Sequence, residues 1–84
     1  MITIRNSRHL ARVIRHLRET THMSRRGLAG RLFISPKSLG DRETFRRGWD
    51  TDSTIDVARV FGFDVALVPA RHPGARSTGT GWPA

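Results

Sequence analysis

Apolar side chains recur along the first 20 residues at the spacing of one helix face. The positions that share this face are Leu10, Val13, Ile14 and Leu17. Their i, i+3, i+4, i+7 spacing predicts an amphipathic helix over residues 7–20. Asn6 or Ser7 can cap its start, because both side chains carry an oxygen that accepts a backbone N–H. The opposite face is expected to carry Arg5, Arg8, Arg12 and Arg15. A solvated surface and one or two phosphate contacts are both open interpretations of these arginines.

A second, shorter helix is predicted over residues 24–32. Ser24 is a good N-cap, and Leu28 with Leu32 forms an i, i+4 apolar pair. The two glycines inside the segment each cost about 1 kcal/mol relative to alanine. This helix therefore depends on packing against its neighbours.

A third helix is predicted over residues 35–43. Ser35 can cap its start, and Pro36 follows at the first helical position, where its fixed φ is suited to the helix. Leu39 is its one strongly apolar residue. A helix with so few apolar positions is expected to leave one side facing solvent or a partner.

A fourth helix is predicted over about residues 53–61, after a loop over 44–51. Asp50, Thr51 and Asp52 precede it as capping and acidic residues near its positive end. Gly62 stands where a left-handed helix terminator is expected. The apolar positions of this helix, which place it at the centre of the fold, are Ile55, Val57, Ala58, Val60 and Phe61.

Two short segments have the composition of strands. Phe63, Val65 and Leu67 alternate with other residues over 63–68, and two isoleucines alternate over 2–4. An unpaired apolar edge strand is a liability, so the strand over 63–68 is expected to pair with residues 2–4 or with a second chain. The expected fold is therefore mainly α with a short C-terminal β-strand. Residues 1–69 form the expected domain, and residues 70–84, rich in small residues and proline, form an expected flexible tail.

The charge of the chain is unevenly distributed. The net charge is +8; residues 1–47 carry 12 basic and 3 acidic side chains, whereas residues 48–84 carry 3 basic and 4 acidic ones. A one-sided basic field attracts polyanions and speeds their encounter with the protein. Nucleic acid is the first expected partner, and an anionic membrane surface the second.

Several function classes are not expected. A chain of 84 residues buries too little surface to support a deep catalytic pocket, so we do not expect an enzyme. The chain has no cysteine, and His9 and His16 are two helical turns apart, about 10.5 Å, which is too far for one metal ion. No apolar run is long enough to span a membrane. We therefore expect no metal, no cofactor, no small-molecule ligand and no membrane partner.

The two central predicted helices, separated by Phe33 and Ile34, have the arrangement of a helix-turn-helix. The segment from Met23 to Leu39 resembles the helix-turn-helix of the lambda repressor/Cro-type family. Residues 55–69 are similar to the last helix of that family and to the strand that some members append. The resemblance covers residues 7–69 and implies a compact domain of four to five helices. The positions of the segment from Met23 to Leu39 that match the family pattern are Leu28, Ala29, Leu32, Ile34, Ser35 and Leu39. Glu43 matches the glutamate that often follows the recognition helix of the family.

The sequence departs from the family pattern at three positions. Phe33 occupies a turn position where the family usually has glycine. If that position requires a positive φ, phenylalanine is strained there by about 1 kcal/mol. Arg42 replaces a residue that is often apolar and Phe45 replaces a frequent glycine, so Phe45 or Trp49 is expected to fill the space.

The resemblance implies sequence-specific binding of double-stranded operator DNA by a small Cro-like repressor, as in a bacteriophage. The helix over 35–43 would enter the major groove. The expected base contacts are Pro36, Lys37, Ser38, Asp41 and Arg42. The expected phosphate contacts are Ser24, Arg25, Arg26, Ser35, Arg46 and Arg47. With this function we expect a homodimer that forms through Phe63, Val65 and Leu67. We also expect the protein to be associated with the nucleoid in the bacterial cytoplasm.

Other interpretations of these residues remain open at this point. Asp41 equally fits an intrahelical ion pair with Arg42 or a nearby arginine, and Arg46 and Arg47 also fit a merely solvated loop. For the whole chain, the alternative is an antitoxin of the same fold that binds a toxin partner and regulates its own operon. An RNA-binding or membrane-surface protein is a third interpretation, weakened because RNA readers usually carry stacking aromatics on a sheet.

Overall fold

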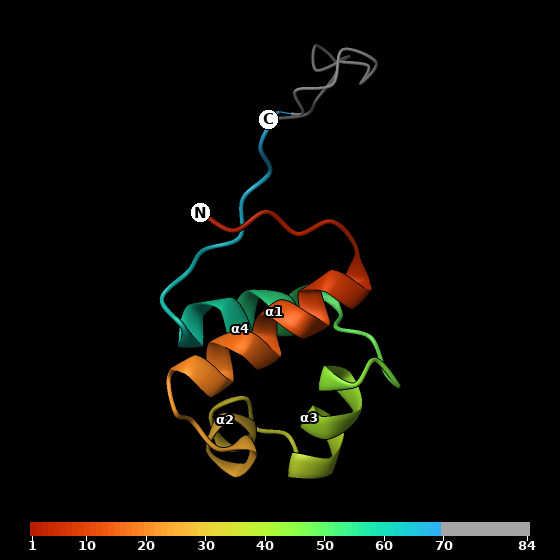
Figure 1. Cartoon of the computed structure of the whole chain (residues 1–84), viewed down its shortest axis with the longest axis vertical. Helices are drawn as coiled ribbons and strands as arrows, with labels where there is room; N and C mark the ends of the chain where they lie inside the picture. Colours follow the sequence, from red (N-terminus) through yellow and green to blue (C-terminus); the bar gives the residue numbers. More distant parts are fainter. Residues whose placement is uncertain (70–84) are drawn as a thin grey trace.

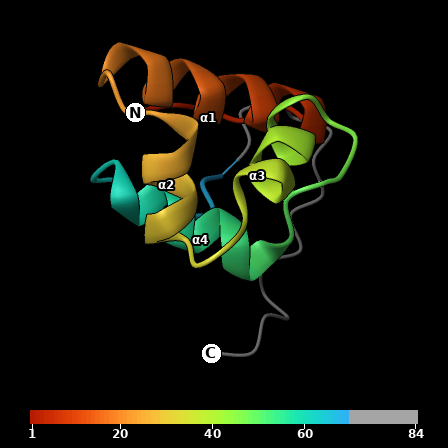
Figure 2. The same cartoon turned by 90° about the horizontal axis from the view of Figure 1, so that it is seen from below.

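A computed structural model of the chain describes residues 1–69 and confirms a mainly helical fold. The four helices are α1 (Ser7–Thr20), α2 (Arg25–Arg31), α3 (Pro36–Glu43) and α4 (Thr51–Val60). Helices α2 and α3 lie together at one end of the molecule, and α1 and α4 run across their other side (Figures 1 and 2). Helix α3 packs against both α2 and α1. The expected tail lies outside the described residues.

Each helix begins at a residue whose side chain caps it. The capping oxygens accept a backbone N–H three residues later at 2.7–3.0 Å. Helix α4 begins at Thr51, two residues earlier than the expected start, because Asp50 is its cap. A cap of this kind contributes about 1 kcal/mol in a typical helix. The four caps are Asn6, Ser24, Ser35 and Asp50.

Each helix also ends in the same way, with a residue in the left-handed region. After α2, Phe33 has a φ of +57°. Its N–H donates to the Gly30 carbonyl at 3.3 Å, and the Ile34 N–H donates to the Ala29 carbonyl at 3.0 Å. This pair of bonds is the Schellman motif, and it recurs after the other three helices. The left-handed residues that follow α1, α3 and α4 are His22, Phe45 and Gly62.

The core lies where the four helices meet. Its fully buried apolar side chains are Ala11, Ile14, Leu28, Ala29, Leu39 and Val57. Trp49 packs against this cluster from the loop between α3 and α4. Phe45 or Trp49 was the residue expected to fill space at this point of the fold, and Trp49 packs there. Within residues 1–69, no helix combines the length and the apolar character needed to span a bilayer.

The expected strands do not form within the described chain. Residues 1–5 and 63–69 belong to neither helix nor strand, and no backbone hydrogen bond joins the two segments. Pairing of 63–68 with 2–4 is therefore wrong. Both segments run on the side of α1 and α4 that is remote from α2 and α3 (Figure 1). A strand needs a partner for its N–H and C=O groups, which strand composition alone does not supply.

Candidate functional site

Helix α3 has two faces of opposite character. Pro36 and Lys37 are exposed at its start, and Ser38 and Asp41 are half-buried. The buried positions of the helix are Leu39, Arg42 and Glu43. We call the first set the outer face and the second set the inner face.

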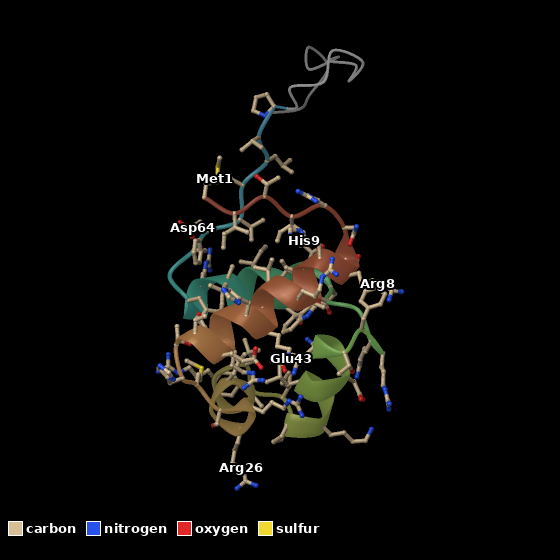
Figure 3. The ribbon with its side chains drawn as sticks, viewed as in Figure 1. Met1, Arg8, His9, Arg26, Glu43 and Asp64 are labelled. Atoms are coloured by element: carbon tan, nitrogen blue, oxygen red, sulfur yellow. The ribbon has the colours of Figure 1, made fainter. Side chains whose placement is uncertain are left out.

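The inner face is anchored by a buried ion pair that sequence reasoning missed. The Glu43 side chain has no exposed surface and accepts hydrogen bonds from Arg18 Nε at 2.6 Å and Arg18 Nη2 at 3.1 Å. The hydrogen bond to Glu43 is the main reason that the pKa of Arg18 is raised above its usual value. Arg18 Nη1 also donates to the Met23 carbonyl at 3.1 Å. Figure 3 shows Glu43 in the middle of the molecule, between α1 and the α2–α3 pair.

Arg25 links the same carboxylate to the protein surface. Its Nε lies 3.3 Å from Glu43 Oε1, and 46% of its side chain is exposed. Its guanidinium lies against α3 at Gly40, where an added methyl group would stand 3.6 Å from Nη1. Arg25, expected to hold a phosphate, is therefore held in place by an ion pair while half of it faces solvent.

The outer face borders a shallow, open surface depression. Its lining residues come from the start of α2, the outer face and the following loop, and they are Arg25, Pro36, Lys37, Gly40, Asp41, Thr44 and Arg46. Lys37 Nζ lies 3.4 Å from Asp41 Oδ2, with 87% of the lysine side chain exposed. The intrahelical partner of Asp41 is thus Lys37 rather than an arginine. An exposed pair of this kind adds little stability, so both groups can turn to another partner at small cost.

Arg42 is placed differently from the expected base contacts. It is only 8% exposed and belongs to the inner face. Its Cζ lies 5.3 Å from the centre of the Trp49 ring, a cation–π geometry. Among the described residues, Arg42 Nε, Arg42 Nη1 and Trp49 Nε1 are buried without a hydrogen-bond partner. Arg42 lies three residues after Leu39 on the buried stripe, which turns it away from the outer face.

The loop after α3 carries two exposed arginines, Arg46 and Arg47. Their backbone N–H groups donate to the Asp41 carbonyl at 2.7 and 3.1 Å, so this stretch of the loop follows α3 closely. Phe45, just before them, has a φ of +60°. The Arg8 guanidinium lies 4.8 Å from the centre of the Phe45 ring, a contact that the sequence did not predict. Figure 3 shows Arg8 beside this loop.

The remaining expected contacts lie around the same end of the molecule. Arg26 is exposed and extends away from the end formed by α2 and α3 (Figure 3). Ser24 and Ser35 use their hydroxyl oxygens to cap α2 and α3, which leaves each O–H free to donate. Figure 2 shows α3 between α2 on one side and the loop of Arg46 and Arg47 on the other. The outer face is thus flanked by cations on both sides.

The three residues expected to form a dimer contact lie outside this site. Phe63, Val65 and Leu67 are 37%, 54% and 94% exposed, at the opposite end of the molecule. Within residues 1–69, Phe63 and Val65 are partly covered and Leu67 is almost fully exposed. Pairing with a second chain stays a prediction.

Comparison with known proteins assigns the chain to no family. The sequence matches no protein-family model, and no curated protein shows significant similarity to it. Within residues 1–69, no cluster of three histidine or acidic side chains is arranged to hold a metal ion. The groups that the site presents are cations, a carboxylate and hydroxyls at the surface of a small helical domain.

Proposed function

We propose that the protein binds double-stranded DNA with a preference for sequence, with the outer face of α3 in the major groove. The observation that carries this proposal is the division of α3 into an anchored inner face and an outer face whose mostly polar side chains are exposed or half-buried. An α-helix fits the major groove of B-DNA, which is about 12 Å wide. A helix whose leading polar side chains stay exposed while its other side is fixed to the domain is suited to that groove.

The outer face carries groups that discriminate between bases. The Lys37 ammonium can donate to the O6 and N7 atoms of guanine, and the Asp41 carboxylate can accept from the N4 amino group of cytosine. Ser38 can donate or accept, and Pro36 adds an apolar contact at the start of the helix. Arg42 is not part of this set, because it is buried against Trp49.

The flanking cations suit the two phosphate backbones that border a groove. Arg26 and Arg25 lie on the α2 side of the outer face, and Arg46 and Arg47 lie on the loop side. The hydroxyls of Ser24 and Ser35 can each donate to a phosphate oxygen. Phosphate contacts of this kind hold a protein in register on the duplex without reading its sequence.

The resemblance to the lambda repressor/Cro-type family supports a more specific proposal. The helices α2 and α3 would form its helix-turn-helix, and the protein would act as a small Cro-like repressor in the bacterial cytoplasm. Two copies joined through residues 63–68 would occupy the two halves of a pseudo-palindromic operator and block a promoter. A second chain would also cover the apolar side chains that 63–68 leaves exposed.

The test is a titration of the purified chain against DNA from the flanks of its own gene, with random DNA as competitor and the mass measured in the same buffer. With about 6–10 phosphate contacts per dimer, affinity is expected to fall about 10³–10⁵-fold between 50 and 200 mM salt. A flat salt dependence, or no preference over random DNA, would refute the proposal.

Two matched substitutions separate base contacts from phosphate contacts. Lys37→Ala is expected to weaken binding to the preferred site by about 1–3 kcal/mol and to leave random DNA almost unaffected. Arg26→Ala is expected to weaken both and to lower the salt slope by about one. Arg59→Ala removes the same charge from α4, outside the basic residues 1–47. It should change neither the affinity for DNA nor the salt slope. Equal losses for Arg26→Ala and Arg59→Ala would mean that only net charge matters.

The exposed apolar residues of 63–68 also favour a second candidate, an antitoxin of the same fold. Val65, Leu67 and Val68 are 54%, 94% and 57% exposed, a surface that a toxin could cover. A toxin gene next to this one, or a stable one-to-one complex with its product, would support this candidate.

A further inference from the structure

The turn between α2 and α3 presents a large aromatic side chain to solvent. Phe33 is 94% exposed, and it is the only large apolar side chain that is exposed within residues 5–62. The other exposed apolar residues of the described chain belong to its irregular ends, 1–4 and 63–68. Phe33 therefore contributes nothing to the core.

The backbone at Phe33 is also unfavourable for any residue with a side chain. Its φ of +57° lies in the left-handed region, where glycine is free of strain and phenylalanine is not. The two hydrogen bonds of the Schellman motif use only backbone atoms, so glycine would make them equally well. Neither packing nor backbone geometry thus explains a phenylalanine here.

Two other positions of this chain show what is unusual about Phe33. His22 has the same φ and is also exposed, but its imidazole is polar and well hydrated. Phe45 has a φ of +60°, and its ring is covered by the Arg8 guanidinium. Phe33 alone of the three combines strain with an uncovered apolar ring.

The surroundings of Phe33 indicate what covers it. Residues 24–37 contain no acidic side chain, and their cations are Arg25, Arg26, Arg31 and Lys37. A surface that carries negative charge next to apolar groups would complement both the ring and these cations. The backbone of DNA has this character, because each phosphate is bonded to a deoxyribose whose C–H groups are apolar.

We propose that the Phe33 ring packs on a deoxyribose at the rim of the groove that α3 enters. The inference rests on the proposed function and adds an apolar backbone contact to it. Phe33 lies two residues before Ser35, the cap of α3, so it is placed beside the end of α3 that leads into the groove. A sugar contact does not depend on base identity, so Phe33 strengthens binding to preferred and random DNA equally.

The experiment compares Phe33→Gly with His22→Gly, which relieves the same backbone strain at another helix end without removing an aromatic ring. Both variants are expected to melt higher than the unsubstituted protein, by about 4–8 °C for a domain of this size. Only Phe33→Gly is expected to lose affinity. A ring face covered by a sugar removes roughly 50 Å² of apolar surface from water, which corresponds to a loss of about tenfold on both DNAs.

Phe33→Asn provides a second measurement, because asparagine tolerates the left-handed region and also lacks the ring. It should lose affinity as Phe33→Gly does. Unchanged affinity in both Phe33 variants overturns the inference, and loss of a copurifying protein instead would assign the ring to a protein partner. If the Phe33 variants lose affinity for the preferred site alone, the ring contacts a base, such as a thymine methyl, rather than a sugar. If the unsubstituted protein binds neither DNA, the proposed function and this inference fall together.

Discussion

The inner and outer faces of α3 each carry an ion pair, and the two pairs differ in almost every respect. On the inner face, Glu43 has no exposed side-chain surface and lies 2.6 Å from Arg18. On the outer face, Asp41 lies 3.4 Å from Lys37, whose side chain is 87% exposed. The inner pair joins residues 25 positions apart, whereas the outer pair joins neighbours on one helix.

The two pairs are expected to differ in what they contribute to stability, although they lie within the same eight-residue helix. Breaking a buried pair leaves an uncompensated charge in the core and costs about 3–5 kcal/mol. An exposed i, i+4 pair contributes about 0.3–0.5 kcal/mol, so it can be given up when a ligand arrives. The inner face can therefore hold α3 in place while the outer face exchanges partners.

The largest expected effect comes from Glu43→Gln. Glutamine keeps the shape of the side chain but removes the charge that pairs with the partly buried Arg18 guanidinium. We expect the free energy of unfolding to fall by about 3–5 kcal/mol, measured by urea denaturation.

The matched control for Glu43→Gln is Asp41→Asn, the same chemical change two residues away on the outer face. It should change stability by less than about 0.5 kcal/mol. Equal losses for the two variants would contradict the distinction between the faces.

A smaller effect of opposite sign is expected for Arg42→Met. Arg18 is partly buried and pairs with a carboxylate, whereas Arg42 is buried and faces the Trp49 ring. Two of its buried nitrogens have no hydrogen-bond partner, which costs about 1–3 kcal/mol each, and a cation–π contact offsets only about 0.5–2 kcal/mol. Methionine has a similar shape and no polar hydrogen, so the free energy of unfolding should rise.

Arg18→Met is the control for this prediction, because it removes the partner of Glu43. It should lower the melting temperature while Arg42→Met raises it. A fall in both would mean that Arg42 has a stabilising role that its contacts do not explain.

The difference between these arginines also shows how far the sequence could predict the site. The single strongly apolar residue of α3, Leu39, predicts that one side of the helix is exposed, and the family resemblance places Pro36 and Lys37 on that side. Both residues are exposed in the structure. Arg42 is expected among the base contacts because the family resemblance places it there, although it lies three residues after Leu39 at a position where the family often has an apolar residue. The sequence does not show which side chain Arg42 meets in the interior, because Trp49 belongs to the following loop.

The fold was predictable where the signal is local. Caps and apolar stripes located all four helices, with α4 displaced by two residues. The pair of Arg18 with Glu43 was missed because it joins positions 25 residues apart. The predicted pairing of residues 63–68 with residues 2–4 was wrong, because strand composition does not show which segment would supply the hydrogen-bond partners.

A still smaller gain is expected for Gly40→Ala, in the middle of α3. Alanine is favoured over glycine inside a helix by about 0.5–1 kcal/mol. The added methyl group would stand 3.6 Å from Arg25 Nη1, an ordinary contact distance, so most of this gain should appear as a higher melting temperature.

Two other helical glycines serve as controls for Gly40→Ala. Gly30→Ala meets nothing within 4 Å and should gain as much. Gly27→Ala would place its methyl group 3.1 Å from Ser24 Oγ, the capping atom of α2, and should gain less. A loss of stability in Gly40→Ala alone would mean that Arg25 cannot move aside from α3.

The smallest effect links the inner face to the next helix through pH. The pKa of Asp50, the cap of α4, is lowered mainly by the hydrogen bonds from Ser53, with smaller contributions from the charges of Arg42 and Arg47. Because the folded pKa lies below the unfolded value near 4, ionised Asp50 stabilises the fold above that pH. This contribution is lost as the pH falls through the folded pKa.

Asp50→Asn isolates this contribution, since asparagine caps a helix without titrating. The advantage in melting temperature of the unsubstituted protein over Asp50→Asn should be constant near neutral pH and should shrink as the pH falls below about 4. In the Arg42→Met background, Asp50 loses one of the charges that lower its pKa, so the advantage should begin to shrink at a higher pH. If the melting-temperature advantage depends on pH in the same way in both backgrounds, the charge of Arg42 does not act on Asp50. The contacts of Arg42 would then stop at Trp49 and would not extend to α4.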